Sequence, residues 1–171
     1  LNDQIYTSLT YFDTQFENLI EFVPAPVSKY SNVAKTRTVG VESQTSTNFF
    51  DGRLRLSLGL GYQEPKNSTN GRWLVRRPLR TASLKSSLDV TNDLNMGAEV
   101  IHTGEKLDSI GSNKFVTVED FTLIHLFGNY RISDRASVFA RVDNLENKDY
   151  QASYSYYNQG SIYKLGAQLS F

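Results

Sequence analysis

Residues 162–171 alternate without interruption between apolar and polar or small side chains. Five apolar residues occupy every second position: Tyr163, Leu165, Ala167, Leu169 and Phe171. Strict alternation predicts a β-strand with one apolar face and one polar face. Such a strand fits a soluble β-sandwich, in which the apolar face covers a core. It also fits a membrane barrel, in which that face meets lipid and the other face meets water.

The same alternation recurs along the chain and is clearest at residues 54–63, where leucines and Tyr62 alternate with Arg, Ser, Gly and Gln. No segment shows a helical period, so the chain is predicted to be all-β and antiparallel. Residues 121–132 are apolar on both faces, and the pattern alone does not orient them. About nine strands are expected, at residues 1–12, 19–23, 37–50, 54–63, 79–90, 94–102, 121–132, 136–143 and 162–171.

The predicted connections alternate in length. Short turns are expected at 13–16, 51–52, 91–93 and 133–135, and long loops at 24–35, 64–78, 103–118 and 146–160. Short turns on one side and long loops on the other are typical of outer-membrane β-barrels, with the turns in the periplasm, whereas a Greek-key sandwich has no such rule. We therefore predict a transmembrane barrel segment whose first and last strands both run towards the periplasm. Since bacterial barrels have even strand numbers, nine strands predict one arc of a larger barrel.

Composition excludes several classes of protein. Lys plus Arg and Asp plus Glu are both 18, so no basic field indicates a nucleic-acid partner. No apolar run approaches the ~18 residues of a membrane helix. The absence of cysteine excludes disulfides and thiolate metal sites, and no cofactor is expected. Because the first residue is Leu1 and no signal peptide follows, we expect a fragment or a processed product.

The segment Asn-Leu-Glu-Asn-Lys-Asp-Tyr at residues 144–150 carries a family resemblance. It resembles the Asn-Leu-Phe-Asp-x-x-Tyr motif that precedes the last strand of TonB-dependent outer-membrane receptors, with Glu146 and Asn147 in place of Phe-Asp. Gly160 followed by alternating residues up to a terminal Phe is similar to the family's ending. Val-Gly-Val-Glu at residues 39–42 and Asn-Leu-Ile at 18–20 are similar to two other family segments.

Two further segments resemble the cobalamin-receptor branch of this family. They are Leu-Val-Arg-Arg-Pro at residues 74–78 and His-Thr-Gly-Glu-Lys-Leu-Asp at residues 102–108. Siderophore receptors share most of the other segments. His125 stands where the family more often has an acidic residue.

The resemblance implies a 22-stranded barrel plugged by an N-terminal domain, of which residues 1–171 are the C-terminal part without the plug and the first strands. It implies a multi-pass protein of the bacterial outer membrane that takes up a scarce ligand, cobalamin or an iron complex, with energy from TonB. The implied partners are outer-membrane lipid and lipopolysaccharide, the TonB complex through the missing N-terminal part, and the small-molecule ligand. A siderophore receptor is one alternative. A small structural or adhesive barrel, closed within 171 residues, is another.

The residues expected to matter for function lie in the long loops and in the last strand. Candidate ligand-binding residues are Arg72, Trp73, Arg76, Tyr154, Tyr156 and Tyr157. Tyrosines supply rigid amphipathic contact area, and an interfacial girdle or loop packing is the alternative role for them. Guanidinium groups bind phosphates in bidentate fashion, so Arg72, Arg76, Arg77 and Arg80 are also candidates for lipopolysaccharide, or for plain loop solvation. Four residues are assigned to membrane insertion in the closing strand: Tyr163, Leu165, Leu169 and Phe171.

Enzymatic chemistry is not predicted. Four carboxylates lie on predicted polar faces, where they are expected to pair with Arg53, Arg55, Lys85 and Arg141: Glu42, Asp89, Glu99 and Asp143. No Ser-His-Asp or paired-carboxylate arrangement can be argued. His102 and His125 are far apart and lack the spacing of metal ligands, so a structural role is expected for both.

Overall fold

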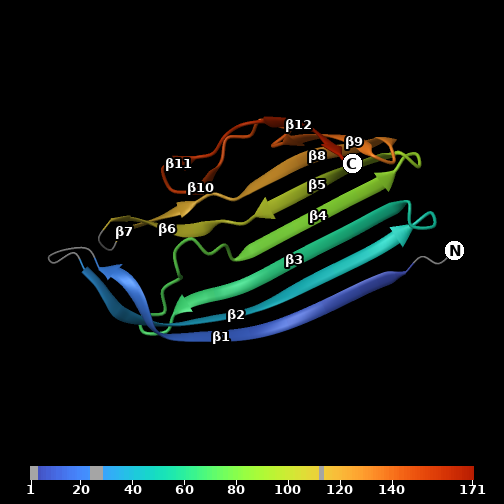
Figure 1. Ribbon diagram of the computed structural model, residues 1–171. Coiled ribbons are helices and arrows are strands. Elements are labelled where there is room, and N and C mark those ends of the chain that lie inside the picture. Colours follow the sequence, from blue (N-terminus) through green and yellow to red (C-terminus); the bar gives the residue numbers. More distant parts are fainter. Residues whose placement is uncertain (1–3, 24–28, 112–113) are drawn as a thin grey trace.

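One antiparallel sheet dominates the computed structural model, which describes residues 4–23, 29–111 and 114–171. Figure 1 shows the sheet curving from β1 at its lower edge to β12 at its upper edge. Its eight strands follow one another in chain order: β1 (Ile5–Val23), β2 (Lys29–Phe49), β3 (Leu54–Asn67), β4 (Arg80–Asp89), β5 (Leu94–Thr103), β8 (Phe121–Ser133), β9 (Ala136–Asp143) and β12 (Ile162–Leu169). The prediction of an all-β antiparallel fold is confirmed.

Two small hairpins complete the described structure. β6 (Lys106–Gly111) pairs with β7 (Lys114–Val118), and β10 (Gln151–Ser153) pairs with β11 (Tyr156–Tyr157). Both lie in connections that the sequence predicts as long loops, at 103–118 and 146–160. In Figure 1 they lie at the opposite end of the strands from the two chain termini.

The expected turn at residues 13–16 is wrong, and with it the count of nine strands. β1 runs through these residues, because their backbone pairs with residues 36–39 of β2 in unbroken register, and Arg37 Nε also donates to Asp13 Oδ1 at 2.8 Å. The irregularity comes later, at a bulge between Phe16 and Ile20 in which Asn18 has φ 58°. With eight strands, β1 runs opposite to β12, so the prediction that both run towards the periplasm is also wrong.

Several strands extend further into the loop side than predicted. β2 begins at Lys29, where a loop was expected up to residue 35, and β3 continues to Asn67. Residues 24–28 of that predicted loop lie outside the described residues. Spanning a membrane takes ~9–11 tilted residues, so the 19 residues of β1 and 21 of β2 project well beyond it.

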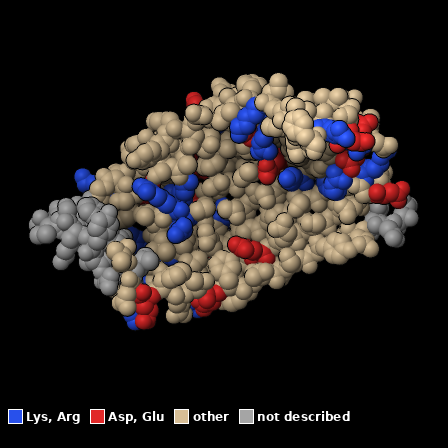
Figure 2. All heavy atoms as spheres, in the orientation of Figure 1, with Lys and Arg blue, Asp and Glu red and all other residues tan. Residues whose placement is uncertain are grey.

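The register gives the sheet one apolar and one polar face, as predicted. Successive cross-strand partners form one apolar row: Leu58, Leu84, Val100 and Ile124. The neighbouring row on the other face is polar: Ser57, Lys85, Glu99 and His125. These rows orient β8, which the sequence pattern left open. Figure 2 shows acidic and basic side chains interspersed on the viewed face, most densely near its upper edge.

The turn at Asp51 and Gly52 is confirmed as a tight hairpin. Their φ values are 54° and 86°, and Arg53 N donates to Phe50 O at 3.2 Å. Phe50 before them also has a positive φ, of 55°, so three residues in a row adopt the left-handed conformation, which Asp and Gly favour in hairpin turns.

The sheet is open, since β1 and β12 lie at its two edges and do not pair with each other among the described residues. Three buried hydrophobic side chains are found among the described residues: Val118 at the end of β7, and Phe121 and Leu123 at the start of β8. The apolar face stays exposed, with Leu9 73% and Leu165 83% accessible. A sheet face of this kind suits contact with lipid. The described residues contain no helix long and apolar enough to cross a membrane.

Candidate functional site

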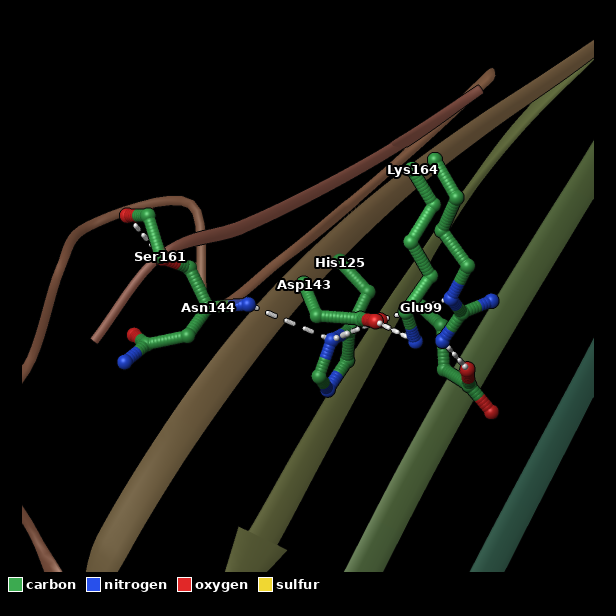
Figure 3. A network of polar contacts seen from close by, with 7 residues as sticks. Glu99, His125, Asp143, Asn144, Ser161 and Lys164 are labelled. Carbon is green, nitrogen blue, oxygen red and sulfur yellow. Dashed lines mark hydrogen bonds and ion pairs between the residues drawn. The ribbon is translucent and has the colours of Figure 1, made fainter. Parts of the chain in front are cut away.

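Charged side chains from four strands meet on the polar face (Figure 3). Glu99 of β5 is the cross-strand partner of His125 of β8, and Arg141 of β9 is the partner of Lys164 of β12. Asp143, at the end of β9, lies among them. We call these five residues the wall cluster: Glu99, His125, Arg141, Asp143 and Lys164.

Ion pairs connect the wall cluster. Arg141 Nε lies 2.6 Å from Asp143 Oδ1, and Arg141 Nη2 lies 3.3 Å from Glu99 Oε2. Lys164 Nζ lies 2.7 Å from Asp143 Oδ2. Two carboxylates thus face two basic side chains, and each carboxylate of the wall cluster has an ion-pair partner. The expected pairing of polar-face charges is confirmed here and at Arg55, which lies 2.7 Å from Asp89. Among the described residues, Glu42, Arg53 and Lys85 form no such ion pair.

His125 joins the wall cluster to the connection that follows β9. It is buried, and its Nδ1 lies 3.0 Å from Asp143 Oδ1 and accepts a hydrogen bond from Asn144 N at 3.3 Å. A ring nitrogen either holds a lone pair, and accepts from Asn144, or carries a proton, and donates to Asp143. His125 Nδ1 can therefore make only one of these two hydrogen bonds at a time, depending on whether it carries a proton. Sequence reasoning missed this junction, for which the unusual His at that position was the one available signal.

Asn144 in turn anchors the last connection. Its side chain accepts from Lys148 N at 2.9 Å and donates to Lys148 O at 2.9 Å, while Ser161 Oγ donates to Asn144 O at 2.7 Å. Asn144 and Asn147 both have φ 52°, a left-handed conformation that Asn tolerates better than most residues. The first Asn of the 144–150 motif thus holds both ends of the connection to β12.

A second polar centre lies at the loop end, around Asp108 of β6. Its carboxylate is fully buried and accepts hydrogen bonds from Ser153 Oγ at 2.6 Å, Tyr154 N at 2.8 Å and Arg76 Nε at 2.9 Å. Ser109 N also donates to it at 2.8 Å. Burial alone raises the pKa of Asp108, but these hydrogen bonds prevail and lower it to about 2. We call this arrangement the Asp108 clamp, because it ties three separate connections together.

The Asp108 clamp brings together two of the predicted ligand-binding residues, Arg76 and Tyr154. The others lie around it. Arg72 stacks over the ring of Phe115 in β7, with 4.4 Å from the guanidinium carbon to the ring centroid. Trp73 forms a β-bridge with Lys66, whose Nζ lies 4.5 Å from the Trp73 ring centroid.

Tyr156 and Tyr157 form β11 and are 70% and 78% exposed, so their rings are available at the rim. A ligand-binding role for these six residues stays a prediction. Of the other two arginines considered for lipopolysaccharide, Arg77 lines a cavity with Trp73 and Leu107. Arg80 lines a groove with Tyr62 and His102.

The two histidines lie on opposite faces of the sheet. His102 Nδ1 lies 3.0 Å from Thr122 Oγ1 in the row that continues the apolar face, whereas His125 belongs to the polar face. The described residues contain no group of three or more His, Cys, Asp or Glu side chains that fits a metal ion.

The closing strand alternates as predicted, but it ends at Leu169 and not at residue 171. Tyr163, Leu165 and Leu169 lie on the face of Val142, Ala140 and Ala136, their partners in β9. Phe171 follows the strand end and is fully exposed. Their role in membrane insertion stays a prediction.

A cavity of about 350 Å³ lies between β7 and the last connection. Phe121 and Tyr150 pack together in its lining, with ring centroids 4.5 Å apart, and Tyr154 and Tyr157 also line it. We call this cavity the rim pocket. Several of its lining residues come from the 144–150 motif and from β10, so the segment that precedes the last strand also shapes the loop end.

Comparison with protein families gives a match to TonB dependent receptor-like, beta-barrel, over residues 1–145. The chain belongs to the TonB-dependent receptor family. Its members are outer-membrane transporters and not enzymes. The apolar face of this receptor sheet therefore meets outer-membrane lipid, and the wall cluster lies on the inner face of the barrel.

Two relatives of this receptor segment are named Vitamin B12 transporter BtuB. The one from Vibrio vulnificus is 23% identical over 165 residues, which cover 95% of this chain and 25% of the relative. The one from Photobacterium profundum is 25% identical over 170 residues, 96% of this chain and 27% of the relative. The chain thus spans about a quarter of the length of the curated relatives that it matches.

Solved receptor structures share the fold of this segment. A mutant of the ferric enterobactin receptor PfeA from Pseudomonas aeruginosa matches 98% of the chain with a TM-score of 0.81 at 24% identity, over 29% of its own length. The ferric-catecholate import receptor Fiu from E. coli K12 matches 98% of the chain with a TM-score of 0.75 at 22% identity, over 25% of its own length.

Proposed function

We propose that the chain forms wall and extracellular loops of an outer-membrane receptor that takes up cobalamin with energy supplied through TonB. In this role the residues contribute barrel wall, loop structure and ligand contacts rather than chemistry. Lipid and lipopolysaccharide surround the apolar face, and the TonB complex acts through parts of the receptor outside residues 1–171.

One observation supports cobalamin as the ligand. The two segments that resemble the cobalamin branch, 74–78 and 102–108, are in direct contact. Arg76 N donates to Leu107 O at 2.7 Å, and Arg76 Nε donates to Asp108 at 2.9 Å. Segments that share a branch-specific sequence and also share a contact are expected to serve one local function. The names of the two curated relatives point the same way.

An iron-complex receptor is the second candidate, since siderophore receptors are among the solved structures with the same fold. Their identity to this chain supports the fold and leaves the ligand open. The small self-contained barrel is less well supported. The eight strands meet its requirement of an even number, but the edge strands β1 and β12 do not pair among the described residues.

The intact mass of the protein in its native outer membrane should be measured first. A mass several times 19.3 kDa is expected for a full receptor. The full-length gene is then expressed in a strain that lacks its own cobalamin receptor, and uptake of radiolabelled cyanocobalamin is measured with and without TonB. TonB-dependent uptake is expected. Uptake of a ferric siderophore instead would overturn the cobalamin assignment.

A further inference from the structure

The rim pocket has the surroundings of a small-molecule site. It is a cavity of about 350 Å³, within the range of ligand pockets. Its walls are the end of β7 on one side and the start of β10 on the other. Three tyrosines contribute aromatic surface to it: Tyr150, Tyr154 and Tyr157. An aromatic cavity with a few polar groups is the usual composition of a binding site for an organic ligand.

The charged side chains that line the rim pocket carry a net negative charge. Glu119, Asp120 and Asp149 line it, against a single ammonium group at Lys148. All four side chains are exposed, and none has an ion-pair partner within residues 4–23, 29–111 and 114–171. In the wall cluster, by contrast, the charges balance. The carboxylates of the rim pocket are thus available to an external partner.

A cation already binds aromatic surface beside this pocket. Lys106 Nζ lies 5.4 Å from the ring centroid of Phe121, and the Lys106 side chain is buried. The contact occupies Phe121 and leaves the rings of Tyr154 and Tyr157 exposed. Aromatic faces attract cations by about 0.5–2 kcal/mol, and more strongly where water is partly excluded. Nearby carboxylates strengthen the same preference and repel anions.

We propose that the rim pocket binds an organic cation, an ammonium or quaternary ammonium group carried by a small molecule outside the cell. The tyrosines contact its alkyl groups, and Glu119, Asp120 and Asp149 supply the opposite charge. That the pocket faces the outside of the cell rests on the proposed function. The proposal adds the charge of the ligand that the pocket accepts. Anionic ligands such as ferric catecholates are disfavoured there.

The test uses the purified full-length receptor and two probes of equal shape, choline and its uncharged isostere 3,3-dimethylbutan-1-ol. Dissociation constants are measured by saturation-transfer NMR titration. Choline is expected to bind at least about tenfold more tightly than the isostere. Glu119→Gln, Asp149→Asn and Tyr157→Ala are each expected to weaken choline binding about three- to tenfold. Glu146→Gln is the matched control, because Glu146 is exposed in the same connection and does not line the pocket.

Equal affinity for the two probes would overturn the proposal, as would choline binding that all three substitutions leave unchanged. The three substituted positions are exposed, and correct folding is checked by the heat-modifiable mobility of the barrel on gels. Failure of this proposal is distinguishable from failure of the proposed function. Choline binding with the expected variant pattern, but without cyanocobalamin uptake, refutes only the cobalamin assignment. The reverse result refutes only the cation site.

Discussion

The ring of Phe139 in β9 lies directly over Gly166 in β12, its cross-strand partner, and a Cβ atom at Gly166 would overlap the ring. Phe127 covers Gly97 and Phe12 covers Gly40 in the same way. All three pairs lie on the polar face. An aromatic ring over a cross-strand glycine shields the bare backbone, a device known to stabilise sheets.

A graded series of glycine-to-alanine variants tests this arrangement in the full-length receptor. Gly97→Ala is expected to destabilise most, by about 1–3 kcal/mol, because its Cβ would overlap both the Phe127 ring and the Ser86 carbonyl. Gly166→Ala is expected to cost less, since only the Phe139 ring must move. Gly128→Ala is the control, because its Cβ would make ordinary contacts at 3.8 Å and beyond. Urea unfolding in lipid gives the ranking, and a Gly128 variant as harmful as Gly97→Ala would contradict it.

The Asp108→Asn variant is expected to loosen the loop end. The amide keeps one acceptor, while Arg76, Ser153 and Tyr154 compete for it, and a buried partner left unpaired costs about 1–3 kcal/mol. Amide hydrogen exchange in β10 and β11 should become faster, and that in β4 and β5 should not change. Asp134→Asn, in an exposed turn at the other end of the sheet, is the control. Unchanged exchange in β10 would show that the clamp does not hold this hairpin.

The same carboxyl predicts how the loop end responds to acid. The pKa of Asp108 is about 2, lowered from 3.8, so the unfolded carboxyl takes up its proton before the folded one does. The clamp therefore contributes fully above pH 3.8, weakens between pH 3.8 and 2, and is lost below that. Pepsin cleavage of the loops is measured as the ratio of Asp108→Asn to wild-type rates. This ratio should fall towards one as the pH drops to about 2, and a ratio that stays constant over the same window would refute the assignment.

Within the wall cluster, Asp143 should matter more than Glu99. Asp143 faces Arg141, Lys164 and His125 within 3.0 Å, whereas Glu99 meets only Arg141, at 3.3 Å, among the described ion pairs. Asp143→Asn is expected to destabilise the barrel by about 1–3 kcal/mol, and Glu99→Gln by less than about 1 kcal/mol. Urea midpoints of the two variants measured side by side give the comparison. Equal midpoints would mean that Asp143 stabilises the barrel no more than Glu99 does.

The two faces of β12 should respond oppositely to a positive charge. Leu165→Arg places a guanidinium on the lipid face, at a cost of about 2–4 kcal/mol near the middle of the membrane. Gln168→Arg places it on the polar face, next to Ser137, and should be tolerated. The yield of folded receptor in outer-membrane fractions measures both. A lower yield for Gln168→Arg than for Leu165→Arg would invert the assignment of the faces.

The sequence pattern was sufficient for the two faces of every sheet strand except β8 and for most short turns. In a strand with one apolar face, strict alternation fixes which side chains point to that face. It failed where side chains far apart in the chain decide the outcome. Asp13 belongs to a polar triplet that is typical of a turn, but it pairs with Val39 in the β1–β2 ladder, and its side chain accepts from Arg37. Locally, nothing distinguishes the two situations.

The candidate sites divide in the same way. Arg76 and Tyr154 were predicted from residue type and loop position, but Asp108, the buried group that joins them, was noted only as part of a family resemblance. A lone aspartate in a long loop carries no periodic signal. Its burial follows from the β6–β7 hairpin, which lies in a stretch that the sequence suggested was irregular.

The length of β1 and β2 has a consequence for local motion. β3 accompanies β2 only as far as the pair Thr36 and Asn67, and beyond it the backbone of residues 19–23 pairs with β2 alone. A ribbon of two strands is marginally stable in water. Residues 5–16 of β1, by contrast, pair with the part of β2 that is also paired with β3. The bulge at Asn18 lies at the border. We therefore expect β1 to contain two cooperative units. Residues 19–23 should open and close many times for each opening of residues 5–16.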